Sequence, residues 1–435
     1  METITAHLPE IVLYAIGMAA LLTLFLPLSP MTIDLVMLSR DGQIWIYRHR
    51  RIFWAVAVTS FAVLLVRAVL GLPDLSWIGG AEAVVRELSG LSGSADPVWL
   101  EIVGVTSAAM AIAFWSGYVP FVMTPPTGQR LVDIDEGDKL LKPDDVILGF
   151  VHGGEVRAYP RDSISRPHFF TDTVGGTPFT VSYCILCNSG VAFKNELNGK
   201  PLDLKCVTAF NNNIIYQDRH SGNFIQQLDG SVFFGPDKGK VLDSEPVVFA
   251  TWGEWKVLHP DTKLYYAPDI TLRDKMVSLM LQIMIPIRKL GRRTKPWHRI
   301  TGTLDDRLPA MSLVMGVERN GESCGYPLSG LVDAPVINDT VGGEPVVVLY
   351  DGDRDVAEVF SRRINGRALT FTSANGAGDG VVATDDETGA SWDVTGKAVA
   401  GELLGMELDP LPHFNKLFWF SWALFKPGTR IKNAA

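Results

Sequence analysis

The chain has 435 residues, of which 47% are hydrophobic, and its formal net charge is −9. This length predicts two or three structural units with a sizeable buried core. The negative charge and the lack of a long basic run exclude nucleic acid as the main partner. The four cysteines, at positions 184, 187, 206 and 324, are too few for a disulfide scaffold.

Three apolar stretches near the N-terminus have the length of membrane-spanning helices: Ile11 to Leu28, Ile52 to Leu72 and Val98 to Met123. A single stretch of this kind is also typical of a buried core helix, but three in succession favour a transmembrane region over residues 1–125. A cleaved signal peptide fits poorly, because no basic region precedes the first stretch. The sequence therefore predicts an integral membrane protein, with membrane lipid as a partner.

The orientation in the membrane follows from the basic residues between the first two stretches. This connection contains Arg40, Arg48, Arg50 and Arg51, and no comparable cluster precedes it. Positive-inside counting places the connection in the cytoplasm, so that three crossings also leave the C-terminal region in the cytoplasm. If one stretch does not cross, the C-terminal region lies on the other side, and the orientation stays open.

From residue 131 onward the sequence repeats itself. Gly149 recurs as Gly316, an offset of 316 − 149 = 167 residues. Other pairs at this offset are Tyr159/Tyr326, Asn198/Asn365, Asp218/Asp385, Trp252/Trp419 and Trp255/Trp422. The offset slips by one residue at Leu242/Leu408 and then recovers. We interpret residues 131–268 and 310–435 as two copies of one domain.

Each repeat has the pattern of a mainly β domain. Gly-Gly, Asn-Gly and Ser-Gly pairs, which suit hairpin turns, separate short β-branched or aromatic runs. In the first repeat the predicted strands are Val146–Val151, Val156–Tyr159, Pro178–Tyr183, Val191–Phe193, Ile214–Tyr216 and Val232–Phe234. The predicted fold is an N-terminal α-helical transmembrane region of about three helices, followed by two related, mainly β domains.

Residues 269–309, between the repeats, have a different character. Met276 to Ile287 is an almost continuous apolar run, and basic residues follow it at 288–293. The run is too short to span a bilayer, but its basic flank suits an anionic membrane surface. A helix buried between the two domains explains the run equally well. Phe414 to Phe425, rich in Phe and Trp, has the same two interpretations.

The first repeat contains the thiol pair Cys184 and Cys187, and the second has Asp351 and Arg354 at these positions. Two thiols three positions apart can bind one soft metal or form a disulfide. A closed structural zinc site would need a second Cys or His pair, which the sequence does not offer. A thiol redox pair, a soft-metal site and two ordinary buried thiols remain as alternatives.

Two further residues of the first repeat are candidates for the same site. His168 has Pro335 as its counterpart, so it differs between the repeats together with both thiols. As a third ligand it would complete a soft-metal site for copper or zinc, and as a base it would assist redox chemistry. Arg157 has Cys324 as its counterpart. It would hold an anionic substrate, lower a thiol pKa, or serve as a buried-pair or surface cation.

A string of motifs in the first repeat resembles a bacterial family of domains of unknown function, family 3179, over roughly residues 135–268. The matching segments are Gly154–Pro160, His168, Asp172–Gly176, Ser182–Gly190 and Trp252–Thr262. The second repeat, residues 312–432, matches the scaffold motifs and lacks the reactive ones. The resemblance implies redox chemistry, because some relatives carry selenocysteine. Tyr216 stands where relatives have Met, which weakens the interpretation as a copper site.

The function that these patterns favour is a membrane-anchored protein with a thiol redox or soft-metal site in its first repeat. Cys184 and Cys187 would be the reactive or ligating thiols, His168 an auxiliary ligand or base, and Arg157 an electrostatic neighbour. Sequence motifs of common hydrolases, dehydrogenases and kinases are missing. The alternative is a non-catalytic membrane-associated binding or scaffold module with structural cysteines. The sequence identifies no cofactor, electron partner or protein partner.

Overall fold

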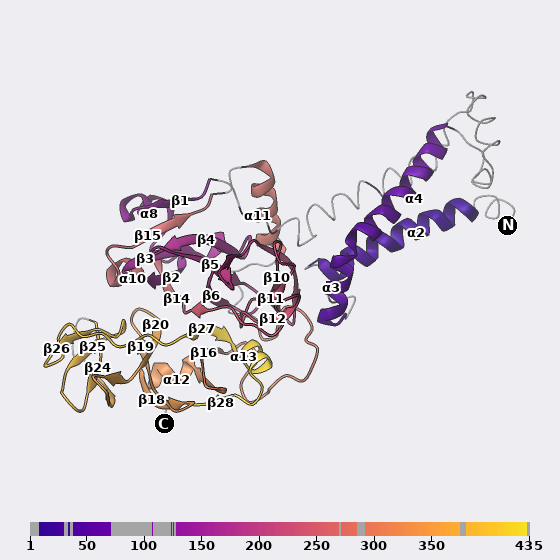
Figure 1. Cartoon of the computed structure of the whole chain (residues 1–435). Helices are drawn as coiled ribbons and strands as arrows, with labels where there is room; N and C mark the ends of the chain where they lie inside the picture. The colour runs from indigo at the N-terminus through magenta and orange to yellow at the C-terminus, as the bar shows by residue number, and fades with distance from the viewer. Residues whose placement is uncertain are drawn as a thin grey trace. The chain divides into compact units, whose positions relative to one another are not determined.

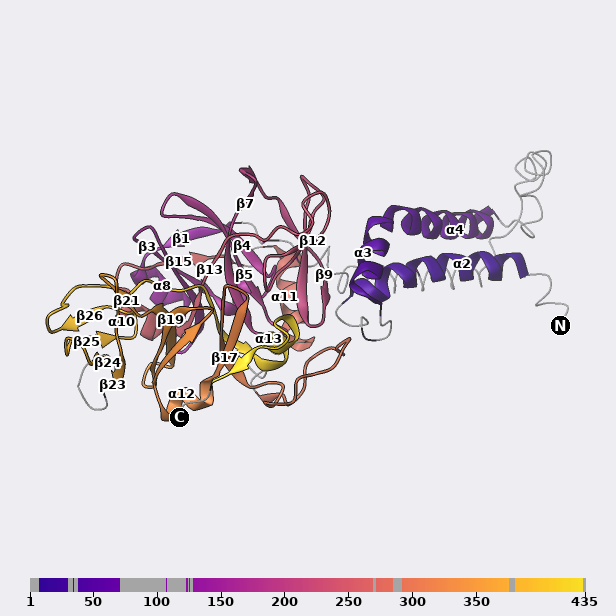
Figure 2. The same cartoon turned by 60° about the horizontal axis from the view of Figure 1, so that its bottom comes forward.

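The computed structural model of the chain (Figures 1 and 2) divides into two compact units, Met1–Val122 and Met123–Ala435. Each unit is described by itself. The residues that the structure describes are 8–29, 34, 38–70, 107, 123, 125, 128–268, 271–284, 292–374 and 380–432.

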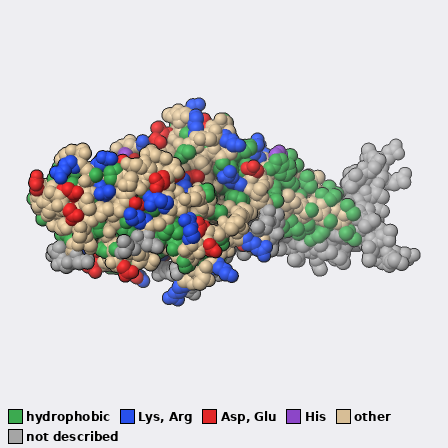
Figure 3. All heavy atoms as spheres, turned by 90° about the horizontal axis from the view of Figure 1, so that it is seen from below, with side chains coloured by type: hydrophobic (Ala, Val, Ile, Leu, Met, Phe, Trp, Pro, Cys, Tyr) green, Lys and Arg blue, Asp and Glu red, His purple; other side chains and the backbone are tan. Residues whose placement is uncertain are grey.

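The described part of the first unit is helical. It contains α2 (Leu8–Phe25), the short 3₁₀ helix η1 (Leu26–Leu28), α3 (Arg40–Arg48) and α4 (Arg50–Leu70). Helices α2 and α4 pack closely, because Gly17 lies where an added Cβ would be 3.0 Å from the Cβ of Ser60. The Tyr14 and Phe61 rings meet edge to face, with centroids 5.9 Å apart. Apolar side chains cover much of the visible surface of these helices (Figure 3).

One helix of this unit, Glu10–Leu28, is long and apolar enough to cross a membrane. Arg40–Arg48 and Arg50–Val66 pass the same test only together, and they are bent by 57°. A signal sequence near the N-terminus or a core helix of a soluble protein also meets these criteria. The predicted helical N-terminal region is confirmed. Apart from residues 107 and 123, the third predicted span lies outside the described residues.

The second unit is built from several β-sheets, as predicted. Its first half, residues 128–268, contains a five-stranded sheet in the order β1-β15-β3-β2-β14, in which only β15 and β3 run parallel. The strands are β1 (Arg130–Val132), β2 (Val146–His152), β3 (Glu155–Pro160), β14 (Val248–Thr251) and β15 (Lys263–Tyr266). Helices α8 (Ile134–Leu140), α9 (Arg161–Ile164) and α10 (Trp252–Leu258) accompany this sheet.

Two four-stranded sheets and a small ribbon complete the first half. The sheet β13-β6-β5-β4 is formed by β4 (Phe169–Val174), β5 (Thr177–Cys184), β6 (Ser189–Lys194) and β13 (Ser244–Glu245). The sheet β12-β11-β10-β9 is formed by β9 (Leu204–Phe210), β10 (Asn213–Asp218), β11 (Phe224–Gln226) and β12 (Val232–Phe234). The ribbon pairs β7 (Glu196–Leu197) with β8 (Lys200–Pro201). All six predicted strands of this half are confirmed.

The second half, residues 310–432, has most of these elements in the same order, but its described residues form no counterpart of β1, α8 or β13. Its sheet β27-β16-β17-β28 corresponds to β14-β2-β3-β15, β18-β19-β20 to β4-β5-β6, and β23-β24-β25-β26 to β9-β10-β11-β12. The strands are β16 (Leu313–Arg319), β17 (Glu322–Pro327), β18 (Val336–Val341), β19 (Glu344–Asp351), β20 (Val356–Ser361), β21 (Arg363–Ile364), β22 (Arg367–Ala368), β23 (Phe371–Ser373), β24 (Val381–Asp385), β25 (Ser391–Asp393), β26 (Ala398–Ala400), β27 (His413–Phe418) and β28 (Arg430–Ile431). Helices α12 (Leu328–Asp333) and α13 (Trp419–Phe425) occupy the places of α9 and α10.

Equivalent tryptophans hold the large sheet of each half. Trp255 donates its indole N–H to the hydroxyl of Thr262, and Trp422 donates to Thr429, both at 2.9 Å. A Cβ added at Gly149 would lie 2.3 Å from the Trp255 ring. This position must therefore remain glycine for the indole to fit. Gly316 meets Trp422 in the same way.

The halves share a hydrophobic core. Ile147 and Val248 of the first half belong to the same buried cluster as Val347 and Trp392 of the second. Strand β27 also contacts β6 and β14. The two halves are therefore packed as a pair, one above the other in Figure 1.

The two aromatic or apolar segments with alternative interpretations behave differently. Trp419, Phe420 and Trp422 are fully buried, so the described structure supports the buried interpretation for Phe414–Phe425. The run from Met276 begins within α11 (Leu272–Met284), which packs one side against the first half. Residues 285–291 lie outside the described residues.

Candidate functional site

Cys184 and Cys187 lie at the turn of a β-hairpin. Cys184 is the last residue of β5, and its register partner Ser189 is the first residue of β6. Residues 185–188 form the turn between them. Both thiols are fully buried, and neither is in a disulfide. The site is therefore a dithiol enclosed by protein at the end of a sheet.

A network of buried, uncharged side chains surrounds the sulphur of Cys187. Ser189 Oγ lies 3.1 Å from this sulphur, and Asn213 Nδ2 lies 3.3 Å from it. Gln227 Oε1 accepts a hydrogen bond from each of these two side chains, at 2.7 Å. Strands β6 and β10 thus hold two polar groups against one sulphur atom.

The backbone fixes the orientation of these groups. The N–H of Leu228 donates to Asn213 Oδ1 at 3.0 Å, so the amide nitrogen of Asn213 must face the sulphur. Ser189 donates its hydroxyl proton to Gln227 and can therefore accept the thiol proton of Cys187. When Cys187 ionises, the Ser189 hydroxyl can turn and donate to the thiolate.

The two thiols differ in acidity. Burial raises the pKa of the Cys184 thiol, and its hydrogen bond to Cys187 raises this pKa further. Burial also opposes ionisation of Cys187, but hydrogen bonds from Cys184, Ser189 and Asn213 outweigh this effect and lower its pKa to about 7. Cys187 therefore ionises first, while Cys184 remains a protonated donor.

His168 lies before β4 with a backbone φ of 78°. Its Nδ1 is 3.0 Å from the carbonyl oxygen of Tyr183. Because a carbonyl only accepts, Nδ1 carries the proton. Burial lowers the pKa of His168 to about 4, so the ring is neutral at physiological pH. Its described hydrogen bonds anchor the start of β4 to β5, and none of them reaches a thiol.

The described residues contain no group of three or more His, Cys, Asp or Glu side chains that could hold a metal ion. The predicted set of Cys184, Cys187 and His168 is therefore not assembled as a metal site in this structure. A metal held by the two thiols alone stays a prediction.

Arg157 is a buried cation of the first half. It pairs with Glu155 on its own strand, and its Nε lies 3.4 Å from Asp172 Oδ2 on β4. Tyr159 donates to the same Asp172 oxygen at 2.8 Å. No described hydrogen bond or ion pair joins Arg157 to either thiol. These contacts fit the buried-pair interpretation.

The second half has a similar acid group, with its cations on β28 and directly after it. Asp339 accepts from Tyr326 at 2.8 Å, as Asp172 does from Tyr159. Two cations pair with Asp339: Arg430 of β28, whose Nη2 lies 3.3 Å from Asp339 Oδ2, and Lys432, whose Nζ lies 3.2 Å from Asp339 Oδ1. Arg430 is the register partner of Cys324 on the parallel strand β17.

An ion pair replaces the thiols in the second half. Asp351 Oδ2 lies 2.6 Å from Arg354 Nη1, and Asp351 Oδ1 accepts the backbone N–H of Arg354 at 3.1 Å. Val356 stands at the position of Ser189. The hairpin turn therefore forms without sulphur in this half.

The thiol-bearing turn is held against the second half. The N–H of Phe418 donates to the carbonyl oxygen of Cys187 at 3.1 Å. Asn188 Nδ2 donates to the carbonyl oxygen of Lys416 at 2.7 Å, and Tyr183 donates its hydroxyl to Asn188 Oδ1 at 2.9 Å. Strand β27 thus fixes the loop that covers the sulphurs.

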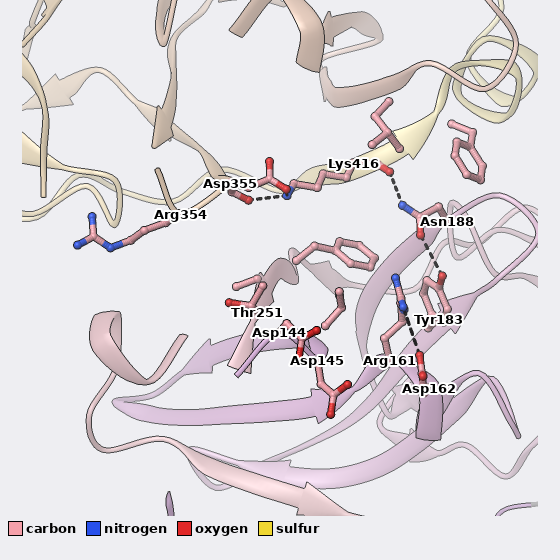
Figure 4. Close-up of a pocket in the computed structure, with 15 residues that line it drawn as sticks. Asp144, Asp145, Arg161, Asp162, Tyr183, Asn188, Thr251, Arg354, Asp355 and Lys416 are labelled. Atoms are coloured by element: carbon pink, nitrogen blue, oxygen red, sulfur yellow. Dashed lines mark hydrogen bonds and ion pairs between the residues drawn. The ribbon is translucent and has the colours of Figure 1, made fainter. Parts of the chain in front are cut away.

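A cavity of about 400 Å³ lies beside this turn, between the two halves (Figure 4). Tyr183 and Asn188 form part of its wall, and neither thiol lines it. Lys416 faces Asn188 from the second half, and Arg161 lies on the first-half side (Figure 4). The charged groups therefore lie next to the dithiol without touching it.

A model of the family described as "Protein of unknown function (DUF3179)" matches residues 118–429. The chain belongs to the DUF3179 family. The match includes α11 and most of both halves, whereas the sequence analysis assigned the resemblance to each repeat separately. No curated protein and no solved structure matches the chain. The family description therefore assigns no activity to the dithiol.

Sequence reasoning missed the polar residues Ser189, Asn213 and Gln227. Ser189 lies within the segment Ser182–Gly190, whereas Asn213 lies on β10 and Gln227 directly follows β11, both far along the chain from the thiols. A signal was present for Ser189, because its counterpart in the second repeat is Val356. A polar residue lost together with the thiols points to a role near them.

Proposed function

We propose that the two halves arose by duplication and that only the first retains sulphur chemistry. The matching sheet orders and the equivalent Trp–Thr hydrogen bonds support this proposal. The second half then has two roles. It completes the shared core, and its strand β27 positions the turn that carries the thiols.

We propose further that Cys184 and Cys187 form a thiol–disulfide redox pair. The observation that carries this proposal is the pair of polar groups at the Cys187 sulphur: the hydroxyl of Ser189 and the amide of Asn213. Such a set stabilises a thiolate on one cysteine and leaves the other protonated. Two thiols that only fill a core need no such arrangement.

The step is thiol–disulfide exchange with a substrate disulfide. The thiolate of Cys187 attacks one sulphur of the substrate, forms a mixed disulfide and expels a substrate thiolate. Cys184 gives up its proton, and its sulphur attacks that of Cys187, which expels the second substrate thiolate. The two expelled thiolates take up the two protons lost by the pair. The products are the Cys184–Cys187 disulfide and the reduced substrate.

The N-terminal unit would anchor this activity to a membrane through the helix Glu10–Leu28. A membrane anchor explains both this helix and the apolar sequence that follows it. The side of the membrane on which the β-rich unit lies follows only from the positive-inside prediction, which favours the cytoplasm.

The test is to equilibrate the full-length protein in detergent with glutathione buffers of graded potential and to measure its intact mass after acid quenching. We expect the loss of two hydrogens in the wild type and no such loss in Cys184→Ser or Cys187→Ser. Cys206→Ser and Cys324→Ser are matched controls, because burial raises the pKa of both these thiols. The alternative, a soft-metal site, is tested by measuring the metal content of the same proteins purified under anaerobic conditions. Near-stoichiometric metal that disappears with the thiols would replace the redox proposal by a metal centre.

The rival function, a membrane-associated binding module, is favoured by the outer face of α11. Leu272, Met276 and Leu279 are 74%, 45% and 59% exposed, whereas Val277 is buried. Asp274 fixes the inner side through its ion pair with Arg166, at 3.3 Å. This rival predicts that the double Cys→Ser variant keeps its function and that Leu272→Ser/Leu279→Ser weakens association with anionic vesicles.

A further inference from the structure

The cavity beside the dithiol is built from positions that correspond between the two halves. Three pairs of its lining residues, Val146/Leu313, Asn188/Asp355 and Thr251/Phe418, are separated by the repeat offset of 313 − 146 = 167 residues. The cavity thus lies where equivalent edges of the halves face each other. Its volume of about 400 Å³ is within the usual range for small-molecule sites.

One lining residue breaks the correspondence. In the first half β14 pairs with β2 without interruption, but the pairing of β27 with β16 shifts between Val314 and Gly316. Val314 faces Leu417 and Gly316 faces Phe414, so β27 contains one extra residue here. This β-bulge explains why the sequence offset recovers from 166 to 167. Bulges of this kind redirect side chains next to functional sites.

Lys416 lies in the bulge, with φ of 50°. Its side chain is only 9% exposed, and burial lowers its pKa. Both described acceptors of its ammonium group belong to Asp355, whose Oδ2 lies 2.7 Å away. An ammonium group has three donors, so one remains for a ligand in the cavity. An inserted, buried lysine in a left-handed conformation is costly unless it serves a function.

Arg161 is the matching cation on the first-half side. Among the residues that the structure describes, the side-chain contacts of its guanidinium are with its neighbour Asp162, at 3.3 and 3.4 Å. In Figure 4, Arg161 lies near the Tyr183 hydroxyl, whereas the side chain of Lys416 runs away from Asn188 and its ammonium group ends beside Asp355. Both cations line the cavity, and each pairs with an acid that also lines it, Arg161 with Asp162 and Lys416 with Asp355. A ligand carboxylate can contact the donors that remain on either cation.

The cavity also has an acidic wall. Asp144 and Asp145 lie on the first-half side, away from Asn188 in Figure 4. Asp144 is exposed and makes no hydrogen bond or ion pair with the residues that the structure describes. An anion alone would be repelled by this wall. A ligand with a carboxylate at one end and an ammonium group at the other is complementary to both walls.

We propose that this cavity binds the substrate of the dithiol and that the substrate is a small zwitterionic disulfide, such as a disulfide of an amino acid or a short peptide. Its carboxylate would lie between Lys416 and Arg161, and its ammonium group would face Asp144 and Asp145. Asn188 of the turn at residues 185–188 lines the cavity, and neither thiol does. The turn must open for the exchange. Opening would break its two hydrogen bonds to β27, those of Cys187 with Phe418 and of Asn188 with Lys416. The assignment rests on the proposed redox function.

The experiment compares two oxidants of the reduced, full-length protein. Glutathione disulfide carries the charges that the cavity fits, and bis(2-hydroxyethyl) disulfide carries none. Stopped samples are alkylated, and the rate constant for loss of the Cys184 and Cys187 thiols is measured with each oxidant. We expect the ratio of the two rate constants to favour glutathione disulfide. Lys416→Met should lower this ratio about tenfold, the effect of one hydrogen bond to a charged group.

Lys426→Met is the matched control, because Lys426 is another lysine of the second half with a largely buried side chain, 14% exposed, that pairs with a carboxylate, that of Glu318. It should leave the ratio unchanged. If Lys416→Met does not fold, Arg161→Met gives the same readout. S-methylglutathione, which cannot be reduced, provides a test without mutation and should slow only the reaction with glutathione disulfide.

The possible outcomes separate the two proposals. If neither oxidant converts the thiols to a disulfide, the redox function itself is refuted. If both convert them with similar rate constants, and neither Lys416→Met nor S-methylglutathione changes the ratio, the redox function stands and the cavity is not its substrate site.

Discussion

The cation beside Asp172 should be movable from β3 to β15, because in the second half Arg430 of β28 pairs with Asp339, with Lys432 as a second cation. Arg157 and Lys263 are register partners on the parallel strands β3 and β15. Their counterparts on β17 and β28 are Cys324 and Arg430. Arg157→Cys alone removes the cation nearest to Asp172. Adding Lys263→Arg should place a guanidinium back beside it.

The magnitude follows from the burial of the pair. The side chains of Arg157 and Asp172 are 7% and 9% exposed, so the single variant leaves a carboxylate buried without its cation. Breaking a buried ion pair in this way costs roughly 3 to 5 kcal/mol. At roughly 2 °C per kcal/mol for a protein of this size, Tm should fall by about 6 °C or more. The double variant should recover at least half of that loss.

The assay is thermal unfolding of the full-length protein in detergent under reducing conditions, followed by near-ultraviolet circular dichroism. The reverse exchange, Cys324→Arg/Arg430→Lys, is the matched control in the second half and should also retain most of the stability. A double variant no more stable than Arg157→Cys would refute the compensation. If Arg157→Cys lost thiol reactivity without losing stability, Arg157 would instead have a role in the reaction of the thiols.

Three more predictions test the packing and the electrostatics. Ser189→Ala should raise the pKa of Cys187 from about 7 by about one to two pH units, because the thiolate loses a hydrogen bond. The ultraviolet absorbance of the thiolate measures this pKa. An unchanged titration would contradict the role given to the Ser189 hydrogen bond. Gly149→Ala should lower the unfolding free energy by about 2 kcal/mol or more, because its Cβ meets Trp255, whereas Gly352→Ala, which has room, should have little effect in the same denaturation. The pKa of His168 is lowered from 6.5 to about 4, so only the unfolded chain takes up this proton between these pH values and stability falls as pH falls through them. His168→Gln should remove about 3 kcal/mol of that fall, and a denaturant midpoint with the same pH dependence in both proteins would disprove it.

The β-rich fold could be predicted from the sequence because the relevant signals are local. Runs such as Val146–Val151 alternate with Gly-Gly and Asn-Gly turns, and each of these features acts over a few residues. The β-bulge is also visible in the sequence, because the offset between the repeats falls to 166 at Leu408 and returns to 167 further along the chain. Its meaning became visible only with the pairing of β27 and β16.

The site was harder to predict because its parts meet through long-range packing. His168 and Arg157 both lie near the thiols in sequence and differ between the repeats, yet the structure gives them other partners, Tyr183 and Asp172. Asn213 and Lys416 belong to distant strands, and no spacing rule links them to Cys187. A residue that differs between two copies of a domain can reflect compensation elsewhere, as at Arg157, as well as chemistry.

The turn at residues 351–355 has a practical consequence for the study of this protein. It has the conformation of the thiol-bearing turn, with an ion pair in place of sulphur and Val356 in place of Ser189. Asp351→Cys/Arg354→Cys would therefore install a second dithiol in the same molecule, in a hairpin of equal shape but without the donors around it. Each chain would then contain its own internal reference. The difference in reduction potential between the two pairs would measure what the polar surroundings of Cys187 contribute beyond the geometry of the turn.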